Sequence, residues 1–414
     1  MNGEEPLRIL QLVHGYPPAV GGVEFAVRDI CERLVARHGA DVTVFTTDAY
    51  TNANYLDGSL PTVPIQEGEV QNGVKVRRFP VVTTWARPLR VLQRGFYDLR
   101  LPFNDVLRTL YQGPISPAMR KAAAAFEADV VVAASFPLNH MNYAFQHPGR
   151  RVVLIGALHT DDPWGYERPN LLSLVNRAHA TVAFTEAERD WLLAKGASAE
   201  RVRVLGLGID PDPCVPHPAA LRRELGIADG DYLVAYVGQQ GGHKGIEVLI
   251  EALPALLEAV PDACLVVAGS RTPYSEVLER LGSELPAPAR ARFRLLSDLS
   301  MQQKTDLLAA CDVFASPSGH ESFGITNLEA WARSRPVVLG DGPAQRSITE
   351  PGVSSILVPY RDTAALAAAL VRLARDPGLR RRLGEAGRRR LLERFTLDAV
   401  ADAYYELYRE AAAA

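Results

Sequence analysis

The chain has 414 residues, a length that predicts two or three domains of ordinary size. Hydrophobic residues make up 47% and charged residues 22%, with 32 glycines and 29 prolines, which excludes a collagen, a disordered chain and a disulfide-stapled miniprotein. Lys and Arg total 45 against 48 Asp and Glu, a formal charge of -3. The protein therefore lacks the basic field that duplex nucleic acid requires, and nucleic acid is not an expected partner.

The four cysteines are far apart and form no C-x-x-C pair. Cys31, Cys264 and Cys311 lie inside apolar stretches, so we expect small buried side chains in a reducing compartment. The first residues, MNGEEPLRILQLVHG, are acidic where a signal peptide needs basic residues, and no stretch approaches a membrane-spanning length. These features predict a cytoplasmic protein.

Short apolar strands alternate with helices in the first half of the chain. LRILQLV has the length of a strand, GGVEFAVRDICERLVARHG repeats apolar residues at helical spacing, and DVTVFTT is a second strand. Strand, glycine-bearing loop, helix and strand indicate a βαβ unit and hence a parallel sheet. Further strands are expected at 74–76, 129–134, 151–156, 181–184 and 201–205.

Two segments interrupt this pattern. Residues 48–72 are polar and are predicted to form a mobile surface loop. Residues 85–112 mix Arg with Leu, Phe and Tyr, which is compatible with an acceptor-binding or membrane-surface pair of amphipathic helices. We favour an ordinary helix that buries its apolar stripe while the arginine stems extend to solvent.

The best linker is DPDPCVPHP, 210–218, because its four prolines favour an extended chain. The βα alternation then restarts, with strands expected at 232–238, 263–269, 292–298, 313–318, 336–341 and 354–359. Intervening segments have helical patterns, and 363–414 is helical and rich in Ala, Leu and Arg. The sequence thus predicts an α/β protein with two Rossmann-like, doubly wound domains, 1–210 and 219–395.

Two glycine-bearing loops join a strand to a helix, the position at which open α/β sheets bind ligands. Gly21 and Gly22 would let a diphosphate approach the backbone at a helix N-terminus, although a plain turn explains them equally well. In the second domain, Gly238–Gly245 places Lys244 at a helix start, where a cation is unfavourable unless an anionic ligand offsets it. A flexible turn with an exposed Lys is the alternative.

The segment HESFGITNLEAWARSRPVV, 320–338, carries two carboxylates eight positions apart, Glu321 and Glu329. Gly324 lies near the start of the expected helix, whose first N–H groups form an anion cradle. Both carboxylates can then project toward one cleft, where they would accept hydroxyl hydrogen bonds from sugar or ribose. Because apolar strands flank the segment, we do not expect it to be a solvated face.

In combination and in this order, these motifs resemble the retaining nucleotide-sugar glycosyltransferases of family four, which adopt the GT-B fold of two such domains facing each other across a cleft. The resemblance covers nearly the whole chain. It is carried by Gly21–Glu24, Leu158–Thr160, Gly208–Asp210, Gly238–Ala252, the E-x7-E element Glu321–Glu329 and Gly352–Pro359.

The resemblance implies a role for each matching position. Lys244 would neutralise the donor diphosphate, Glu321 would bind hydroxyls of the transferred sugar, and Glu329 would bind the ribose. His159 would contact a hydroxyl of the donor sugar. The backbone groups implied in holding the diphosphate are those of Gly22, Gly324, Ile325 and Thr326, with Gly21 beside them.

Two positions depart from the family pattern. Gln239 stands where the family usually has an Arg, so a permanently charged phosphate contact is replaced by a neutral donor. The usual glycine-rich turn and Pro-Glu after the next strand are replaced by GPAQRS, from which Arg346 could return the positive charge. The family requires no metal or other cofactor, and the D-x-D matches at 210–212 and 229–231 have the composition of turns.

The function predicted from these features is transfer of a hexosyl group from a UDP- or GDP-sugar to a small-molecule, glycan or lipid acceptor. A nucleotide-sugar-binding protein with little transferase activity and a nucleotide-sugar epimerase are the alternatives. Acceptor choice is expected from loops 48–72, 85–112 and 161–170, and oligomeric state is not predicted. We interpret the arginine runs 380–382 and 388–390 as solvated helix faces, with peripheral membrane contact as the alternative, and expect 397–414 to pack back on the first domain.

Overall fold

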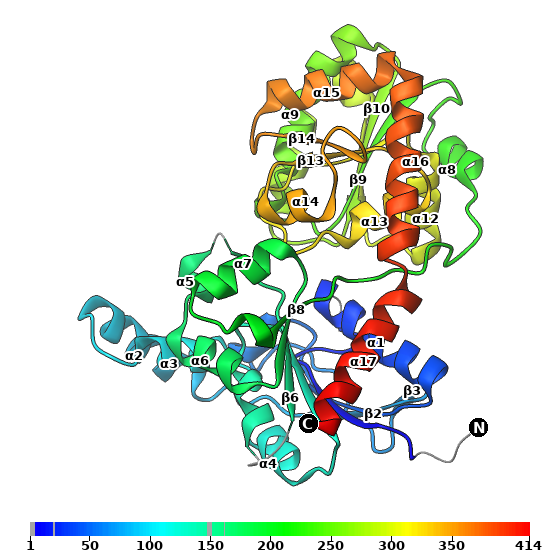
Figure 1. Ribbon diagram of the computed structural model, residues 1–414. Helices are drawn as coiled ribbons and strands as arrows, with labels where there is room; N and C mark the ends of the chain where they lie inside the picture. The colour runs from blue at the N-terminus through cyan, green and yellow to red at the C-terminus, as the bar shows by residue number, and fades with distance from the viewer. Residues whose placement is uncertain (1–4, 20, 147–150, 161) are drawn as a thin grey trace. The chain divides into compact units, whose positions relative to one another are not determined.

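The computed structural model describes residues 5–19, 21–146, 151–160 and 162–414 (Figure 1). The chain forms two compact units. Unit 1 consists of Met1–Gly208 and Leu397–Ala414, and unit 2 of Ile209–Thr396. The expected linker belongs to unit 2, where the Asp212 carboxylate accepts a hydrogen bond from Arg333 at 2.9 Å. The His217 N–H donates to Asp306 at 2.6 Å in the same unit.

Unit 1 is built on an eight-stranded sheet with the order β3-β4-β2-β1-β5-β6-β7-β8. The strands are parallel except for β3, which pairs antiparallel with β4. All strands predicted in this half are confirmed, while the two-residue β3 was not predicted. The strands are β1 (Arg8–Leu12), β2 (Asp41–Thr47), β3 (Val70–Gln71), β4 (Val74–Phe79), β5 (Val130–Ala134), β6 (Val152–Ile155), β7 (Ala180–Ala183) and β8 (Val202–Val204).

The helices of unit 1 include one from the far end of the chain, α17, which contacts α1. The Arg37 guanidinium of α1 pairs with Asp398 at 3.0 Å and Asp402 at 2.8 Å, and α17 buries Tyr404 and Tyr408 completely. The α-helices are α1 (Gly22–His38), α2 (Ala86–Asp98), α3 (Asn104–Gln112), α4 (Pro117–Ala125), α5 (Pro163–Tyr166), α6 (Pro169–Arg177), α7 (Glu186–Ala194) and α17 (Leu397–Ala413). Short 3-10 turns are η1 (Asn52–Tyr55), η2 (Asn139–Phe145) and η3 (Ala199–Arg201).

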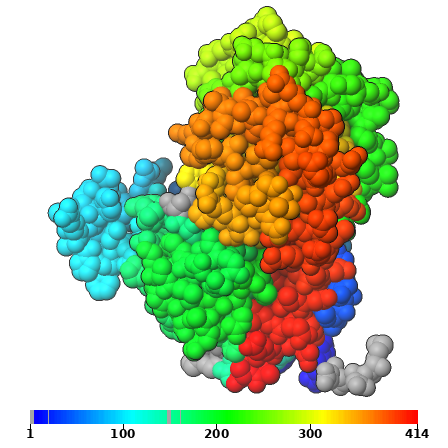
Figure 2. Space-filling model, turned by 45° about the horizontal axis from the view of Figure 1, so that its top comes forward, coloured from blue at the N-terminus to red at the C-terminus, as the bar shows by residue number. Residues whose placement is uncertain are grey.

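Helices α2 and α3 form a hairpin that stands away from the rest of unit 1 as the cyan lobe of Figure 2. The prediction that this segment buries its apolar stripe is wrong. Trp85 is 60% exposed, and Leu99 and Phe103 are each 71% exposed. Helices α2 and α3 contact each other, yet this contact leaves these side chains exposed among the described residues.

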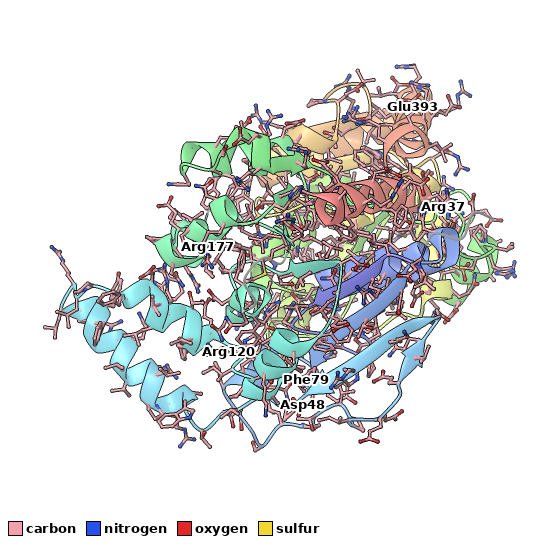
Figure 3. All side chains as sticks on the ribbon, turned by 60° about the horizontal axis from the view of Figure 1, so that its bottom comes forward. Arg37, Asp48, Phe79, Arg120, Arg177 and Glu393 are labelled. Carbon is pink, nitrogen blue, oxygen red and sulfur yellow. The ribbon has the colours of Figure 1, made fainter. Side chains whose placement is uncertain are left out.

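The expectation of a mobile surface loop at 48–72 is also wrong for part of its length. Asp48 and Phe79 lie side by side at its start (Figure 3), where the Asp48 N–H donates to the Phe79 carbonyl at 3.0 Å. Asn54 and Tyr55 are buried, and the Asn54 amide donates to the Pro61 carbonyl at 2.8 Å. These contacts anchor the centre of the segment.

Unit 2 is a second Rossmann-like unit, with a wholly parallel sheet of order β11-β10-β9-β12-β13-β14. Its strands, all of them predicted, are β9 (Tyr232–Val237), β10 (Ala263–Gly269), β11 (Phe293–Ser297), β12 (Val313–Ser316), β13 (Val337–Gly340) and β14 (Ser355–Val358). Its helices are α8 (Pro218–Glu224), the 3-10 turn η4 (Gly242–Lys244), α9 (Ile246–Ala259), α10 (Ser275–Glu284), α11 (Ala287–Ala291), α12 (Met301–Ala310), α13 (Ile325–Ala332), α14 (Pro343–Ile348), α15 (Thr363–Arg375) and α16 (Pro377–Arg394).

The arginine runs of α16 are not simply solvated. Arg388 donates to the Ala332 carbonyl, Arg390 to the Ile348 carbonyl at 2.6 Å, and Arg380 to the Leu373 carbonyl at 2.8 Å. These guanidinium groups satisfy carbonyls at the ends of neighbouring elements, so the prediction of solvated faces is wrong for them. Cys31, Cys264 and Cys311 are buried and unbridged, as predicted. Within the described ranges, no helix combines the length and apolarity needed to cross a bilayer.

Candidate functional site

The strand order of unit 2 reverses between β9 and β12, which are hydrogen-bonded neighbours. From β9 the chain continues to β10 and β11 on one side of the sheet, and from β12 to β13 and β14 on the other. Open parallel sheets bind ligands outside the carboxyl ends of the strands at such a switch point. The loops that leave this point are 238–245 after β9 and 317–324 after β12.

The two loops meet through a partly buried ion pair. Lys244 Nζ lies 2.8 Å from Glu321 Oε1, and the side chains are 18% and 15% exposed. Gly245 permits this approach, because it adopts a left-handed conformation with φ of 67° and an added Cβ would lie 3.0 Å from the Pro317 carbonyl oxygen. The structure therefore brings together two of the predicted site residues.

Helix α13 begins at Ile325, and Gly324, expected near the helix start, is its N-cap with φ of 94°. A side chain at Gly324 would collide with Asn327 Nδ2, which donates to Gln345 Oε1 at 2.9 Å. The N–H groups of Ile325 and Thr326 lie in the first turn, where a helix offers no internal acceptor. Glu321 thus stands in the loop before the helix, beside an anion-attracting terminus.

Glu329 has a different partner from Glu321. It lies on α13 and pairs with Lys304 of α12, with Nζ and Oε1 2.5 Å apart. Each carboxylate of the E-x7-E element is therefore held by its own lysine. The role of Lys304 was not predicted, since its spacing from Glu329 carries no local signal and only the contact between the two helices places them together.

The two positions that depart from the family pattern are both placed by local contacts. Gln239 is exposed, and its carbonyl accepts from the Tyr236 hydroxyl at 3.2 Å. Arg346 is 67% exposed and forms a two-point pair with Asp341, with both distances 2.6 Å. Arg346 is therefore paired with a carboxylate in this conformation, and the expectation that it returns the charge missing at Gln239 stays a prediction.

In unit 1, Gly21 and Gly22 stand where β1 leads into α1. Gly21 is extended, and an added Cβ would lie 2.2 Å from a carboxylate oxygen of Glu24, which folds back toward it. Glu24 Oε1 lies 3.0 Å from His14 Nε2. Burial disfavours the charged form of Glu24, but the bond and charge of His14 outweigh it and hold the pKa below its ordinary value. Gly22 has nothing within 4 Å of an added Cβ.

A second histidine lies behind this glycine loop. His140 is fully buried, its Nε2 is 2.7 Å from the Ala134 carbonyl, and its ring is 5.9 Å from that of His14. Burial, reinforced by His14, lowers the pKa of His140 to about 3. His140 is therefore neutral at neutral pH. Neither histidine was predicted; the position of His14 directly after a strand was the signal available for it.

His159 lies in the loop after β6, with its ring 5.5 Å from that of Tyr166. The loop contains Ala157 in a left-handed conformation, φ of 65°. It is tied down by Glu188, whose Oε1 accepts from the Leu158 N–H at 2.9 Å and whose Oε2 accepts from the Phe184 N–H at 2.7 Å. Glu188 was missed because an acidic residue in a first helical turn ordinarily faces solvent. The predicted acceptor loop begins at Asp161, which lies outside the described residues.

Glu188 is buried at the first turn of α7. Burial raises its pKa to about 8, despite the two N–H donors that favour the carboxylate. Glu188 is thus a titratable carboxyl that binds the N–H of Leu158, the residue directly before His159.

Within the described ranges, no three or more His, Cys, Asp or Glu side chains gather as metal ligands would. Both D-x-D matches stabilise turns. Asp210 accepts from the Asp212 N–H at 3.0 Å, and Asp231 accepts from the Ala228 N–H at 3.0 Å.

Comparison with known families assigns both halves of the chain. Residues 219–390 match the family model described as glycosyl transferases group 1, and residues 21–208 match the glycosyl transferase 4-like domain. The chain belongs to the group 1 glycosyltransferases.

Among curated relatives, this chain is 32% identical to the alpha-maltose-1-phosphate synthase of Mycolicibacterium smegmatis, over 58% of this chain and 65% of that protein. It is 34% identical to the D-inositol 3-phosphate glycosyltransferase of Xylanimonas cellulosilytica, over 58% of each chain. The matched stretch therefore spans less than two thirds of these relatives.

Two solved structures resemble this chain over nearly its whole length. One is HepE of Anabaena in complex with UDP and glucose, with a TM-score of 0.69, 20% identity and coverage of 97% of this chain and 99% of that chain. The other is the sucrose-phosphate synthase of Thermosynechococcus elongatus, with a TM-score of 0.72, 20% identity and 98% coverage of both. These likenesses show the GT-B fold class predicted from the sequence.

Proposed function

We propose that this protein is a retaining, metal-independent glycosyltransferase that moves a hexosyl group from a UDP- or GDP-sugar to an acceptor hydroxyl. The observation that carries the proposal is the Lys244–Glu321 pair, 2.8 Å apart at the switch point of the unit 2 sheet and beside the N-terminus of α13. Membership of the group 1 glycosyltransferases supports it.

Lys244 and α13 supply the positive potential that a diphosphate leaving group needs. Charge develops on the diphosphate as the glycosidic bond breaks, and preorganised donors aimed at that charge lower the barrier. Glu321 holds the ammonium of Lys244 in place through one carboxylate oxygen. We propose that its remaining lone pairs accept hydroxyls of the transferred sugar. Backbone N–H groups of Ile325 and Thr326, opened by Gly324, would bind phosphate oxygens.

The remaining roles follow from the same donor position. Glu329, held by Lys304, would accept the ribose hydroxyls. Gln239, exposed at the end of β9, would offer a neutral hydrogen bond to the diphosphate. Arg346 would reach the donor only by leaving Asp341, so we propose for it a secondary part in donor binding.

In unit 1, the open space around Gly22 suits a close approach of an anionic group to the first N–H groups of α1. His159, on the loop tied by Glu188, would donate to or accept from a sugar hydroxyl. The acceptor would be a small molecule, a glycan or a lipid, selected by the loops of unit 1. The four free cysteines support a cytoplasmic location.

The test begins with thermal shifts of the full chain with UDP, GDP, ADP and their sugars, since a ligand that binds only the folded state raises the melting temperature. Lys244→Ala should abolish the shift, while Lys121→Ala, an exposed lysine of unit 1, should preserve it. Turnover is then followed by NMR of the anomeric proton. A product of inverted configuration, or turnover that requires an added divalent cation, would contradict the proposal.

Two outcomes would favour the alternatives. A clear UDP shift with neither hydrolysis nor transfer across an acceptor panel would indicate a binding protein. Release of a different nucleotide-linked hexose without any acceptor would indicate an epimerase.

A further inference from the structure

The α2–α3 hairpin carries an apolar stripe that nothing in the described part of unit 1 covers. Trp85, Leu92 and Leu99 are spaced seven residues apart, so helical geometry aligns them on one side of α2. Their exposed fractions are 60%, 47% and 71%. Phe103, in the turn between the helices, is 71% exposed, and Val106 of α3 is 37% exposed.

The opposite side of α2 is basic. Helical spacing places Arg87, Arg90 and Arg94 away from the side that carries Trp85 and Leu92. Among the ion pairs of the described residues, Arg94 is the one of these three arginines with an acidic partner in the hairpin, Asp98 at 2.8 Å.

Residues 85–106 contain four arginines against two aspartates, a local excess of two positive charges in a chain whose formal charge is -3. An amphipathic helix of moderate overall hydrophobicity, with aromatic residues on one side and arginines on the other, has the composition of a helix that lies in a membrane interface.

We propose that the α2–α3 hairpin docks this protein on the surface of a bilayer that contains anionic lipid. The side chains of Trp85, Leu92, Leu99 and Phe103 enter the boundary between headgroups and acyl chains. The arginine stems extend toward the headgroups, whose phosphates are complementary to the excess charge. A second copy of the chain is a poorer partner, because it would present the same positive hairpin. The proposal does not depend on the proposed glycosyl transfer.

The first experiment measures co-sedimentation of the full chain with phosphatidylcholine vesicles, with and without phosphatidylglycerol. We expect binding to the anionic vesicles and a blue shift of tryptophan emission that Trp85→Phe removes. The double variant Leu99→Glu with Phe103→Glu should bind at least about tenfold more weakly, because it lacks two apolar side chains that the proposal places in the bilayer. Val215→Glu with Val353→Glu is the matched control, since these residues of unit 2 are 73% and 52% exposed; it should bind like the wild type.

The second experiment tests the charge. Arg87→Gln with Arg90→Gln should remove the preference for anionic vesicles, whereas Arg271→Gln with Arg409→Gln, at exposed sites elsewhere, should keep it. Because these substitutions are at the surface, they test the proposal even if the glutamate variant fails to fold. The proposal would be overturned if the wild-type protein did not co-sediment with anionic vesicles. Undiminished binding of the folded Leu99→Glu, Phe103→Glu variant, or a wild-type dimer in light scattering that this variant dissociates, would overturn it as well.

Discussion

Glu188 provides a stability measurement that tests the buried-carboxyl geometry of unit 1. The perturbation is Glu188→Gln, which keeps the shape of the side chain and removes its titration. Glutamine retains one acceptor oxygen, so one of the N–H groups of Leu158 and Phe184 loses its acceptor. That loss alone should cost about 1–3 kcal/mol of unfolding free energy at acid pH.

The magnitude of the pH effect follows from the pKa. Burial raises the pKa of Glu188 from an ordinary 4.5 to about 8. A carboxyl with a raised pKa in the folded state favours folding in its protonated form, so its contribution is complete below pH 4.5 and is lost as the pH rises through 8. Each tenfold change in the proton affinity of the carboxylate corresponds to about 1.4 kcal/mol, so the loss of unfolding free energy has a ceiling of about 5 kcal/mol.

The assay is urea unfolding of the wild type and of Glu188→Gln at intervals between acid and mildly alkaline pH. The wild type should lose stability relative to the variant as the pH rises, so that the variant's deficit at acid pH shrinks or reverses. Glu186→Gln is the matched control, because Glu186 occupies the same helical turn and is 53% exposed; it should follow the wild-type curve. Wild-type and Glu188→Gln curves that stay parallel would refute the reasoning.

Three further predictions concern unit 1. Gly21→Ala should lower the unfolding free energy by about 1–3 kcal/mol in urea titrations, because its Cβ meets the Glu24 carboxylate, while Gly22→Ala should change it little; equal effects would contradict this. Tyr404→Ala should cost about 3–5 kcal/mol, because it empties a fully buried site on α17, and an unchanged melting temperature would show that α17 does not contribute. The melting temperature should fall as the pH drops below 6.5, because burial lowers the pKa of His140 to about 3 and the folded state therefore resists its protonation. Melting curves of His140→Gln at neutral and acid pH should lack this loss.

Local sequence patterns were sufficient to predict the strands and the parallel sheets of both units. Every predicted strand is present, because strand-length apolar runs bounded by glycine or proline leave few other conformations. The βα order predicted parallel sheets, and parallel sheets place their binding loops at one edge. Gly245 and Gly324 were recognisable as loop glycines, and both adopt left-handed conformations that other residues disfavour.

Local patterns failed where the outcome depends on what lies opposite a side chain. An amphipathic stripe at 85–106 predicts a buried helix face only if another apolar surface meets it, and here none of the described elements does. The arginine runs of α16 have the composition of a solvated face, yet Arg388 and Arg390 donate hydrogen bonds to backbone carbonyls of other helices. Arg346 was expected to return the charge missing at Gln239, and the sequence pattern did not show that it pairs with Asp341, five residues earlier.

The sequence by itself determined that this chain folds as two βα units, at which edge of each sheet the strand-to-helix loops lie, and which family its motifs resemble. These properties follow from periodicity, glycine placement and residue order, all of which are local. Only the tertiary structure decided that Lys244 pairs with Glu321 and Glu329 with Lys304, that Glu188 holds the His159 loop, and that the α2–α3 hairpin is left uncovered. Those outcomes depend on contacts between residues distant in sequence. The distances and burial of these residues determine their ionisation and how strongly they interact, and no local pattern encodes them.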